Sequence, residues 1–382
     1  MRGNCPRTDG KRTVRAGETD RASGRNRKTD ERITEKRVKK KGRKVRRNVY
    51  IYAMTVAAVV CSLSGCGQKS RQTQGAESVR SIAFSADSAY EYVSHQVAFG
   101  ARVPGSDAHA ACRDWLMSEL ERHGVRAEEQ QGVMVNYAGE AQTVRNIVGH
   151  VEGQGVSRAT VLLCAHWDSR PWCDEEEEYA DRFVPVPGAN DGASGVGVLM
   201  EVVRGLQALR GTEVSYPPVD VVFFDCEDMG TPNHYTGVER ENTWCLGSQL
   251  WAQRYMETPE NKRVRYEYGI LLDMVGDPSA TFPKEYFSVH YAQPYVERVW
   301  RAAASLGYGR YFTNQAAYPV TDDHYYVNVI AGIPCIDVID YKMGSETGFP
   351  DWWHTKRDDM RNINKQTLKA VGETVMTSIC SK

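Results

Sequence analysis

Apolar and polar positions follow two alternating patterns from residue 84 onward. Short, nearly continuous apolar runs are typical of strands buried on both faces, and apolar residues at every third or fourth position are typical of amphipathic helices. The first pattern predicts strands over 144–151, 160–164, 219–224, 268–274 and 333–339, and a further strand-like stretch covers 127–137. The second predicts helices over 87–97, 108–123, 193–210, 248–255, 294–306 and 365–379. This alternation predicts an α/β fold of three layers, α/β/α, with a central, mostly parallel mixed sheet.

One of these strands carries an unusual concentration of acids. The apolar run Val221–Phe224 leads directly into Asp225-Cys226-Glu227-Asp228. Buried carboxylates are costly unless a cation or a proton balances them. Open α/β sheets place their sites at the carboxyl ends of strands, so this strand end is a candidate site. The plainer alternative is that the acids only solvate the end of a strand.

Charge is distributed unevenly along the chain, although the whole chain has a formal net charge of −1. Residues 1–47 contain 19 Lys/Arg and 6 Asp/Glu, which leaves 29 basic and 43 acidic residues in the remainder, a net charge of −14. An acidic folded part argues against a nucleic-acid partner.

The basic cluster 39–47 precedes an apolar run over 49–63, which has about the length of a signal peptide and is short for a membrane-spanning helix. The run ends in Leu63-Ser64-Gly65-Cys66, which resembles a bacterial lipobox and implies that Cys66 is lipidated and becomes the mature N-terminus. An uncleaved anchor or an ordinary signal peptide remains an alternative. In each case we expect an exported protein, and the lipobox implies a periplasmic or cell-envelope lipoprotein anchored in a membrane.

These features divide the chain into four parts. We expect a basic, disordered extension over 1–47, a lipoprotein signal segment over 48–66, a polar linker over 67–83 and a single catalytic domain over 84–382.

Seven of the ten cysteines fall in the folded part. Those in apolar runs (Cys164, Cys226, Cys335) are expected to be buried thiols. Cys173 and Cys245 lie in loop-like sequence and could form a disulfide in an oxidising compartment. The pairing of Cys112, Cys173, Cys245 and Cys380 stays open, and no Cys-x-x-Cys spacing suggests a thiolate zinc site.

Further histidines and acids follow other predicted strands or begin helices. They are His166 and Asp168, Asp191 in the loop Gly188-Ala189-Asn190-Asp191-Gly192-Ala193-Ser194-Gly195, Asp273, and His354 near the C-terminus. Each of these residues alone has an ordinary explanation, such as a helix cap or a hydrogen-bonded histidine. Together with Glu227 and Asp228 they match the His/Asp/Glu donors that zinc prefers.

This order of residues resembles the zinc-dependent aminopeptidase family with a co-catalytic metal site. Within it, the chain is most similar to the animal-type (type II) glutaminyl cyclases and their bacterial relatives. Three motifs carry that similarity: Phe223-Phe224-Asp225-x-Glu227, Val320-Thr321-Asp322-Asp323-His324 and Phe349-Pro350-Asp351-Trp352-Trp353-His354-Thr355. The resemblance covers about residues 85–382 and implies a zinc-aminopeptidase-like fold.

The resemblance also implies roles for single residues. One zinc ion per chain would be held by Asp191, Asp228 and His354, with Glu227 as the acid/base residue. Asp273 and Asp322 would form a hydrogen-bonded carboxylate pair beside the α-amine of the substrate, and Trp353 would form a wall of the pocket. The animal enzymes have Glu at the position of Asp228, which shortens this ligand by one methylene here. Trp244 is a candidate for a second pocket tryptophan that those enzymes have.

The implied reaction converts the N-terminal glutamine of a peptide or protein to pyroglutamate with release of ammonia. Its α-amine attacks its own side-chain amide, so the enzyme must orient the two groups, polarise the amide oxygen and move one proton.

Two alternatives stay open. His166, Asp191 and Asp273 could form a second zinc site, with Glu227 as the base for water; the chain would then be a di-zinc aminopeptidase that releases N-terminal residues. A non-enzymatic binding module is the other alternative, which the intact ligand set and Glu227 disfavour.

Overall fold

The structure is a computed structural model that describes residues 84–155, 157, 159–238 and 240–380. The sequence predictions for 1–47, for the signal segment 48–66 with Cys66 and for the linker 67–83 therefore fall outside the described residues. Within the described part, no helix has both the length and the apolar character needed to cross a bilayer.

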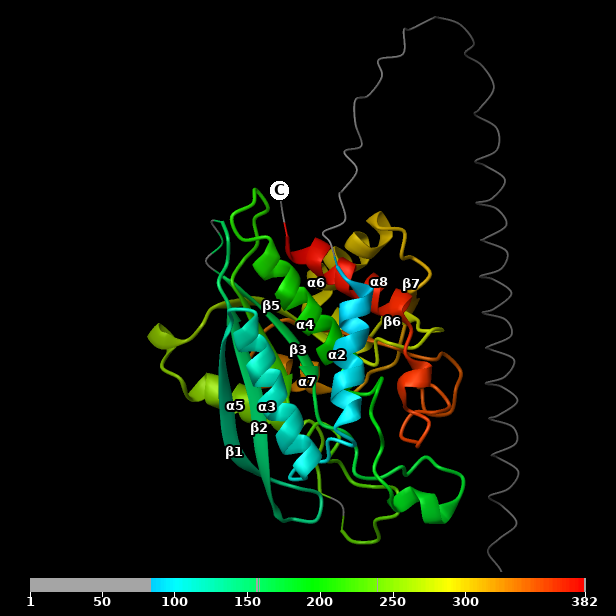
Figure 1. Ribbon diagram of the computed structural model, residues 1–382. Helices are drawn as coiled ribbons and strands as arrows, with labels where there is room; N and C mark the ends of the chain where they lie inside the picture. The colour runs from blue at the N-terminus through cyan, green and yellow to red at the C-terminus, as the bar shows by residue number, and fades with distance from the viewer. Residues whose placement is uncertain (1–83, 156, 158, 239, 381–382) are drawn as a thin grey trace, which may run out of the picture. The chain divides into compact units, whose positions relative to one another are not determined.

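A six-stranded mixed sheet forms the centre of the fold, with the strand order β1-β2-β4-β3-β5-β8 (Figure 1). Strands β4, β3, β5 and β8 are parallel, whereas β2 pairs antiparallel with both β4 and β1. The strands are β1 (Arg126–Val135), β2 (Ala141–Val151), β3 (Thr160–His166), β4 (Val219–Phe224), β5 (Tyr266–Asp273) and β8 (Cys335–Ile339). A separate two-stranded sheet pairs β6 (Phe282–Lys284) with β7 (Phe312–Ala316).

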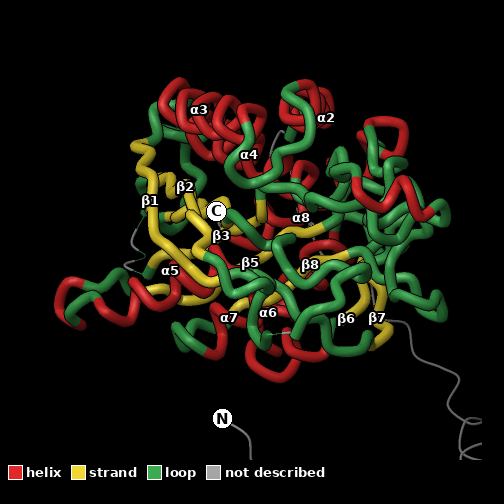
Figure 2. The backbone as a smooth tube through the Cα atoms, turned by 90° about the horizontal axis from the view of Figure 1, so that it is seen from below, coloured by secondary structure: helices red, strands yellow, loops and turns green. Residues whose placement is uncertain are grey.

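Helices cover both faces of the large sheet. Figure 2 shows α2, α3 and α4 on one side of the strands and α5 and α7 on the other. The α-helices are α2 (Ala86–Ala98), α3 (Asp107–Arg122), α4 (Ala193–Ala208), α5 (Leu246–Glu257), α6 (Tyr286–Ser305), α7 (Asp323–Val329) and α8 (Lys365–Ile379). Three 3₁₀ turns are η1 (Tyr179–Phe183), η2 (Glu260–Lys262) and η3 (Met360–Asn362). The predicted three-layer α/β/α fold is confirmed.

Burial explains why the central strands read as continuous apolar runs. Every residue of β3 and of β4 is buried, because helices lie on both faces. The largest core cluster joins residues of α2, α4, α6 and α8 to one face of the sheet, and a smaller cluster around Trp251 and Val327 joins α5 and α7 to the other.

Some elements differ from the prediction. The helix expected over 294–306 begins earlier, at Tyr286, because the Glu285 carboxylate caps it by accepting the N–H groups of Phe287 and Ser288 (2.8 and 2.6 Å). Pro294 lies inside this helix, and the backbone at Ala292 leaves the helical region there (φ −139°, ψ 28°). The short elements α7, β6 and β7 were not predicted, since three to seven residues are too few to show a period.

The cysteine prediction is confirmed for Cys164, Cys226 and Cys335, which are buried free thiols. The suggested disulfide between Cys173 and Cys245 is wrong. Both cysteines are free, as are the other cysteines of the described residues. The Cys245 thiol instead lies 3.1 Å from a carboxylate oxygen of Glu227.

Candidate active site

The carboxyl ends of the parallel strands bring the candidate residues together, at the lower end of the molecule in Figure 1. His166 and Asp273 are the last residues of β3 and β5, and Glu227 and Asp228 follow β4 by three and four residues. His354 belongs to the loop after β8. Segments far apart in the sequence therefore bring the candidate residues together at this edge of the sheet.

Asp191 lies at the centre of the group. One of its carboxylate oxygens is 2.9 Å from His166 Nε2, and the other is 3.5 Å from His354 Nε2. The Asp358 carboxylate accepts the backbone N–H groups of Asn190 and Asp191 (2.8 and 3.1 Å) and so fixes the loop before α4. Gly192 has φ 89°, and a Cβ there would lie 2.7 Å from the carbonyl oxygen of Asp168. The small residues of this loop let Asp191 approach both histidines.

The three residues expected to hold zinc do converge. Ligand atoms of Asp191, Asp228 and His354 lie within 4.8 Å of one another, and all three side chains are buried. His354 Nε2 is 3.1 Å from Asp228 Oδ1, while its Nδ1 faces Asp174 at 3.6 Å, which orients the ring as second-layer carboxylates do for zinc-binding histidines. Buried carboxylates repel one another without a cation. The donor set therefore fits zinc.

A second group of donors shares Asp191 with the first. Ligand atoms of His166, Asp191 and Asp273 also lie within 4.8 Å of one another. His166 Nε2 is 3.2 Å from Asp273 Oδ1. A carboxylate that faces one histidine with each oxygen is suited to bridging two ions, so the geometry keeps the alternative with two metals open.

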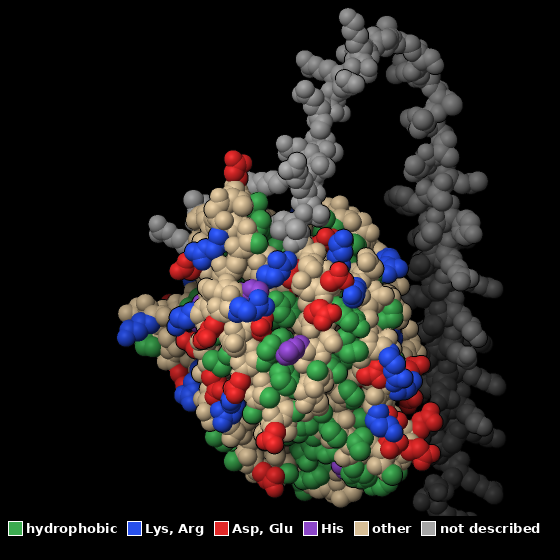
Figure 3. Space-filling view, viewed as in Figure 1, with side chains coloured by type: hydrophobic (Ala, Val, Ile, Leu, Met, Phe, Trp, Pro, Cys, Tyr) green, Lys and Arg blue, Asp and Glu red, His purple; other side chains and the backbone are tan. Residues whose placement is uncertain are grey.

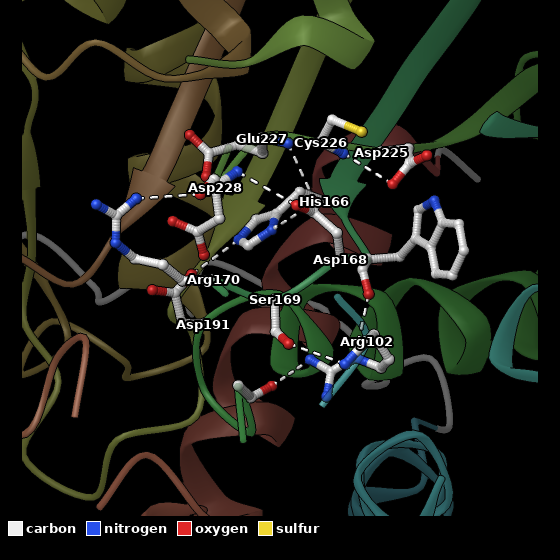
Figure 4. A network of polar contacts seen from close by, with 12 residues as sticks. Arg102, His166, Asp168, Ser169, Arg170, Asp191, Asp225, Cys226, Glu227 and Asp228 are labelled. Carbon is white, nitrogen blue, oxygen red and sulfur yellow. Dashed lines mark hydrogen bonds and ion pairs between the residues drawn. The ribbon is translucent and has the colours of Figure 1, made fainter. Parts of the chain in front are cut away.

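Glu227 points its carboxylate toward the same space (Figure 4). The buried Asp168 carboxylate accepts the backbone N–H groups of Glu227 and Asp228 (3.1 and 3.3 Å) and thereby fixes the direction in which both acids leave the strand end. Burial and, after it, the charge of Asp228 raise the pKa of Glu227 well above its usual value. A buried carboxyl with a raised pKa next to a metal group is typical of an acid/base residue.

A pocket of about 310 Å³ opens onto these groups. Its wall includes Trp353, as expected, and also Trp244, whose role the sequence left as a candidate. The Trp353 ring stacks on the His354 imidazole with centroids 3.5 Å apart, and the Trp244 ring lies parallel to it at 6.3 Å. Asp191, Asp228 and His354 therefore face a pocket with aromatic walls.

Asp273 and Asp322 line the same pocket. Burial raises the pKa of Asp273 to about 8 and also raises that of Asp322. One Asp322 oxygen accepts the N–H of Asp323 (2.5 Å), and the other is buried without a hydrogen-bond partner among the described residues. An unpaired buried oxygen in a pocket is available to a donor on a bound molecule.

Two buried arginines that support the site were not predicted (Figure 4). Arg102 donates hydrogen bonds to the carbonyl oxygens of Trp167, Pro187 and Gly188, and so joins the segment after His166 to the loop that carries Asp191. Arg170 binds the Asp174 carboxylate at 2.8 and 2.6 Å and the carbonyl oxygen of Asp228 at 3.0 Å. No sequence signal identifies these arginines, because their partners are brought close only by the fold.

Comparison with known proteins agrees with this geometry. The sequence profile of peptidase family M28 matches residues 146–379. The crystal structure of glutaminyl cyclase from Tannerella forsythia is 47% identical, with a TM-score of 0.72, over 78% of this chain and 98% of that one. A zinc-dependent exopeptidase from Parabacteroides distasonis is 47% identical, with a TM-score of 0.72, over the same shares. A glutaminyl-peptide cyclotransferase from Boiga irregularis is 23% identical over 308 residues, which cover 73% of this chain and 76% of the relative.

These relatives confirm the resemblance to animal-type glutaminyl cyclases and their bacterial counterparts, and a zinc-dependent site follows from the family. The profile match covers more than half of the chain, and its residues include Asp191, Glu227 and His354. The chain belongs to peptidase family M28.

Proposed function

We propose that this chain is a zinc-dependent glutaminyl-peptide cyclotransferase, which converts N-terminal glutamine to pyroglutamate and releases ammonia. The observation that carries this proposal is the pocket itself. Trp353 and Trp244 line a pocket of about 310 Å³ beside the proposed zinc ligands, with Glu227, Asp273 and Asp322 also in its wall. Such a pocket suits one glutamine residue, and the similarity to the Tannerella forsythia glutaminyl cyclase supports the same reaction.

Asp273 and Asp322 bind the α-amino group of the substrate. Both carboxyl groups line the pocket, and the buried, unpaired oxygen of Asp322 is free to accept a hydrogen bond from the amine. The tryptophan rings exclude water around the glutamine side chain. The tethered amine and amide are thereby held in a reactive orientation, which removes much of the entropic barrier.

Asp191, Asp228 and His354 hold the zinc ion, one per chain, which supplies Lewis-acid polarisation of the side-chain amide oxygen when it is bound. Glu227 accepts the proton that the α-amine loses as its nitrogen bonds to the amide carbon. Glu227 then returns this proton to the amide nitrogen as the C–N bond breaks and ammonia leaves. The raised pKa of Glu227, caused by burial and by Asp228, suits a group that must both accept and release a proton.

The di-zinc aminopeptidase is the second candidate, because Asp191 faces both histidines at 2.9 and 3.5 Å. Mass spectrometry of peptides after incubation separates the two. We expect Gln-initiated peptides to lose ammonia and Leu- or Ala-initiated peptides to stay intact, with one zinc per chain. Release of free N-terminal residues by protein with two metals would instead establish the peptidase.

For the N-terminal segment we propose export and a lipid anchor on Cys66, because a basic run, an apolar run and Leu63-Ser64-Gly65-Cys66 occur in the order of a lipoprotein signal. Cys66→Ser should release the protein from the membrane fraction or stop its processing. Unchanged membrane association of that variant would favour an uncleaved anchor.

A further inference from the structure

Six aromatic rings form a continuous surface outside the pocket, at the same edge of the sheet. They come from the β1–β2 turn, the loop after β3 and the loop after β4, and they are Tyr137, Trp172, Tyr179, Phe183, His234 and Tyr235. Neighbouring ring centroids are 4.6 to 6.0 Å apart. The side chains of Tyr179 and Phe183 are 65% and 49% exposed. Exposed clusters of this kind mark interaction sites.

The loop after β3 adds negative charge to these rings. Its acids are Asp174, Glu175, Glu176, Glu177, Glu178 and Asp181. Asp174 pairs with Arg170, and Asp181 pairs with Lys356, whereas Glu177 and Glu178 are exposed to solvent. Figure 3 shows hydrophobic side chains gathered at the lower end of the molecule and acidic ones at its lower right. The six rings and the acids of 174–181 together form what we call the aromatic–acidic surface.

The aromatic–acidic surface is joined to the pocket through Arg170. The Arg170 guanidinium lies 4.6 Å from the centroid of Trp244, which lines the pocket, and 5.6 Å from that of Trp172, which belongs to the surface. The N–H of Glu175 also donates to the carbonyl oxygen of His354 (3.3 Å). The surface is thus fixed to the segments that carry the proposed zinc ligands.

We propose that the aromatic–acidic surface binds the part of a peptide substrate that follows its N-terminal glutamine, and that it favours basic and aromatic side chains there. This inference rests on the proposed cyclase function. The Trp244 and Trp172 rings both lie beside the Arg170 guanidinium, at 4.6 and 5.6 Å. An extended chain rises about 3.3–3.6 Å per residue, so about three residues cover the distance between the two rings. Discrimination should therefore begin near the fourth residue of the substrate.

The chemistry of the surface favours a basic peptide over other occupants. Lys and Arg side chains gain from the charge of Glu177 and Glu178 and from cation–π contacts with exposed rings. Anionic lipid headgroups are repelled by the same acids, which disfavours a membrane surface. A second copy of the acidic folded part would meet like charge as well.

Three substrates test the proposal with the wild-type protein. We would compare Gln-Ala-amide with the hexapeptides Gln-Ala-Ala-Lys-Phe-Lys and Gln-Ala-Ala-Glu-Phe-Glu by ammonia release. We expect kcat/KM for the basic hexapeptide to exceed that for the acidic one by about tenfold at low ionic strength, mainly through KM. The ratio should shrink in about 0.5 M salt, where charges are screened.

Variants assign the effect to the surface. Glu177→Gln/Glu178→Gln should reduce the ratio to about threefold or less and leave Gln-Ala-amide turnover unchanged. The matched control Glu213→Gln/Glu260→Gln changes two exposed acids that precede β4 and β5, at the opposite edge of the sheet, and should keep the ratio. Phe183→Ala should lower kcat/KM for both hexapeptides several-fold, about the value of one aromatic contact, with Gln-Ala-amide as the folding control.

Equal rates for the two hexapeptides in the wild type, or an unchanged ratio in Glu177→Gln/Glu178→Gln, would overturn the proposal. The proposal would also be overturned if Phe183→Ala changed only self-association, as measured by size-exclusion chromatography. That result would indicate that a second copy of the chain occupies the surface. Loss only of binding to phosphatidylglycerol vesicles would indicate a membrane and would overturn it too. A wild-type protein that cyclises none of the three substrates refutes the proposed function instead.

Discussion

The two histidines of the site have similar neighbours but different positions. His354 faces Asp228, Asp191 and Asp174, and it forms part of the pocket wall between Trp353 and Trp244. His166 faces Asp191, Asp273 and Asp168 at 2.9, 3.2 and 3.5 Å, but the pocket wall, as the described residues form it, does not include it.

This difference matters because the chemistry requires access as well as donor atoms. An ion on the His354 side would meet a bound substrate directly. On the His166 side, the imidazole already serves as the hydrogen-bond partner of Asp273, the residue that we propose binds the amine. The same residue types thus suit a metal on one side and the positioning of a carboxyl on the other.

Removing His354 should produce the largest effect. His354→Ala deletes the only neutral donor of the proposed zinc group, and the remaining carboxylates repel each other when the ion leaves. We expect zinc affinity to fall by more than about 100-fold, since loss of even an outer partner costs 10–100-fold, and turnover to reach background. Zinc content by atomic emission and ammonia release check this. Full zinc occupancy in the variant would contradict the assignment of His354.

Glu227→Gln should have the second-largest effect. We expect kcat to fall by about 10²–10⁴-fold and the zinc content to stay unchanged. The substitution keeps the shape of the side chain and removes only its ability to carry a proton. Thermal unfolding serves as the control for folding. A variant that loses zinc would show that Glu227 is a ligand and that the assignment of Asp228 is wrong.

His166 should matter less if the two sides differ as argued. His166→Ala removes the partner of Asp191 and Asp273 but leaves the proposed zinc group complete. We expect about 10–100-fold lower kcat/KM, as for the loss of a second-layer group, with one zinc retained. Wild-type protein with two zinc ions and the variant with one would place a metal on the His166 side and revive the peptidase alternative.

Much of the fold and of the candidate site could be predicted from the sequence, for a physical reason. The central strands are buried on both faces, so they appear in the sequence as apolar runs. His166, Glu227 and Asp273 lie at or just after the carboxyl ends of these runs, so the sequence identifies them directly. Asp191 was recognisable from the small residues around it, which a loop before a tightly packed helix requires. The roles of these residues and the count of zinc ions remain predictions.

The contacts between distant segments could not be predicted. Arg102 joins two loops through carbonyl oxygens, which any residue provides, so no pattern in the sequence identifies its partners. Cys245 was a candidate for a disulfide because it lies in loop-like sequence. Its contact with Glu227 depends on a loop of 17 residues between them closing back on the strand end.

Substitution of Cys245 should give the smallest effect, and it tests most specifically how Glu227 is held in place. Its thiol lies 3.1 Å from Glu227, and its backbone N–H donates to the carbonyl oxygen of Glu227 (2.9 Å). The backbone is left-handed at Cys245 and at Cys226, both with φ 56°. This conformation is unfavourable for residues other than glycine, and it clusters at functional sites.

Cys245→Ala keeps the backbone contact and removes the donor. A neutral hydrogen bond contributes about 0.5–1.5 kcal/mol, so kcat should fall roughly 2- to 10-fold with KM unchanged. Cys245→Ser, which restores a donor of similar size, should recover most of that loss. If both variants lower the melting temperature alone, the thiol stabilises the loop and does not orient Glu227.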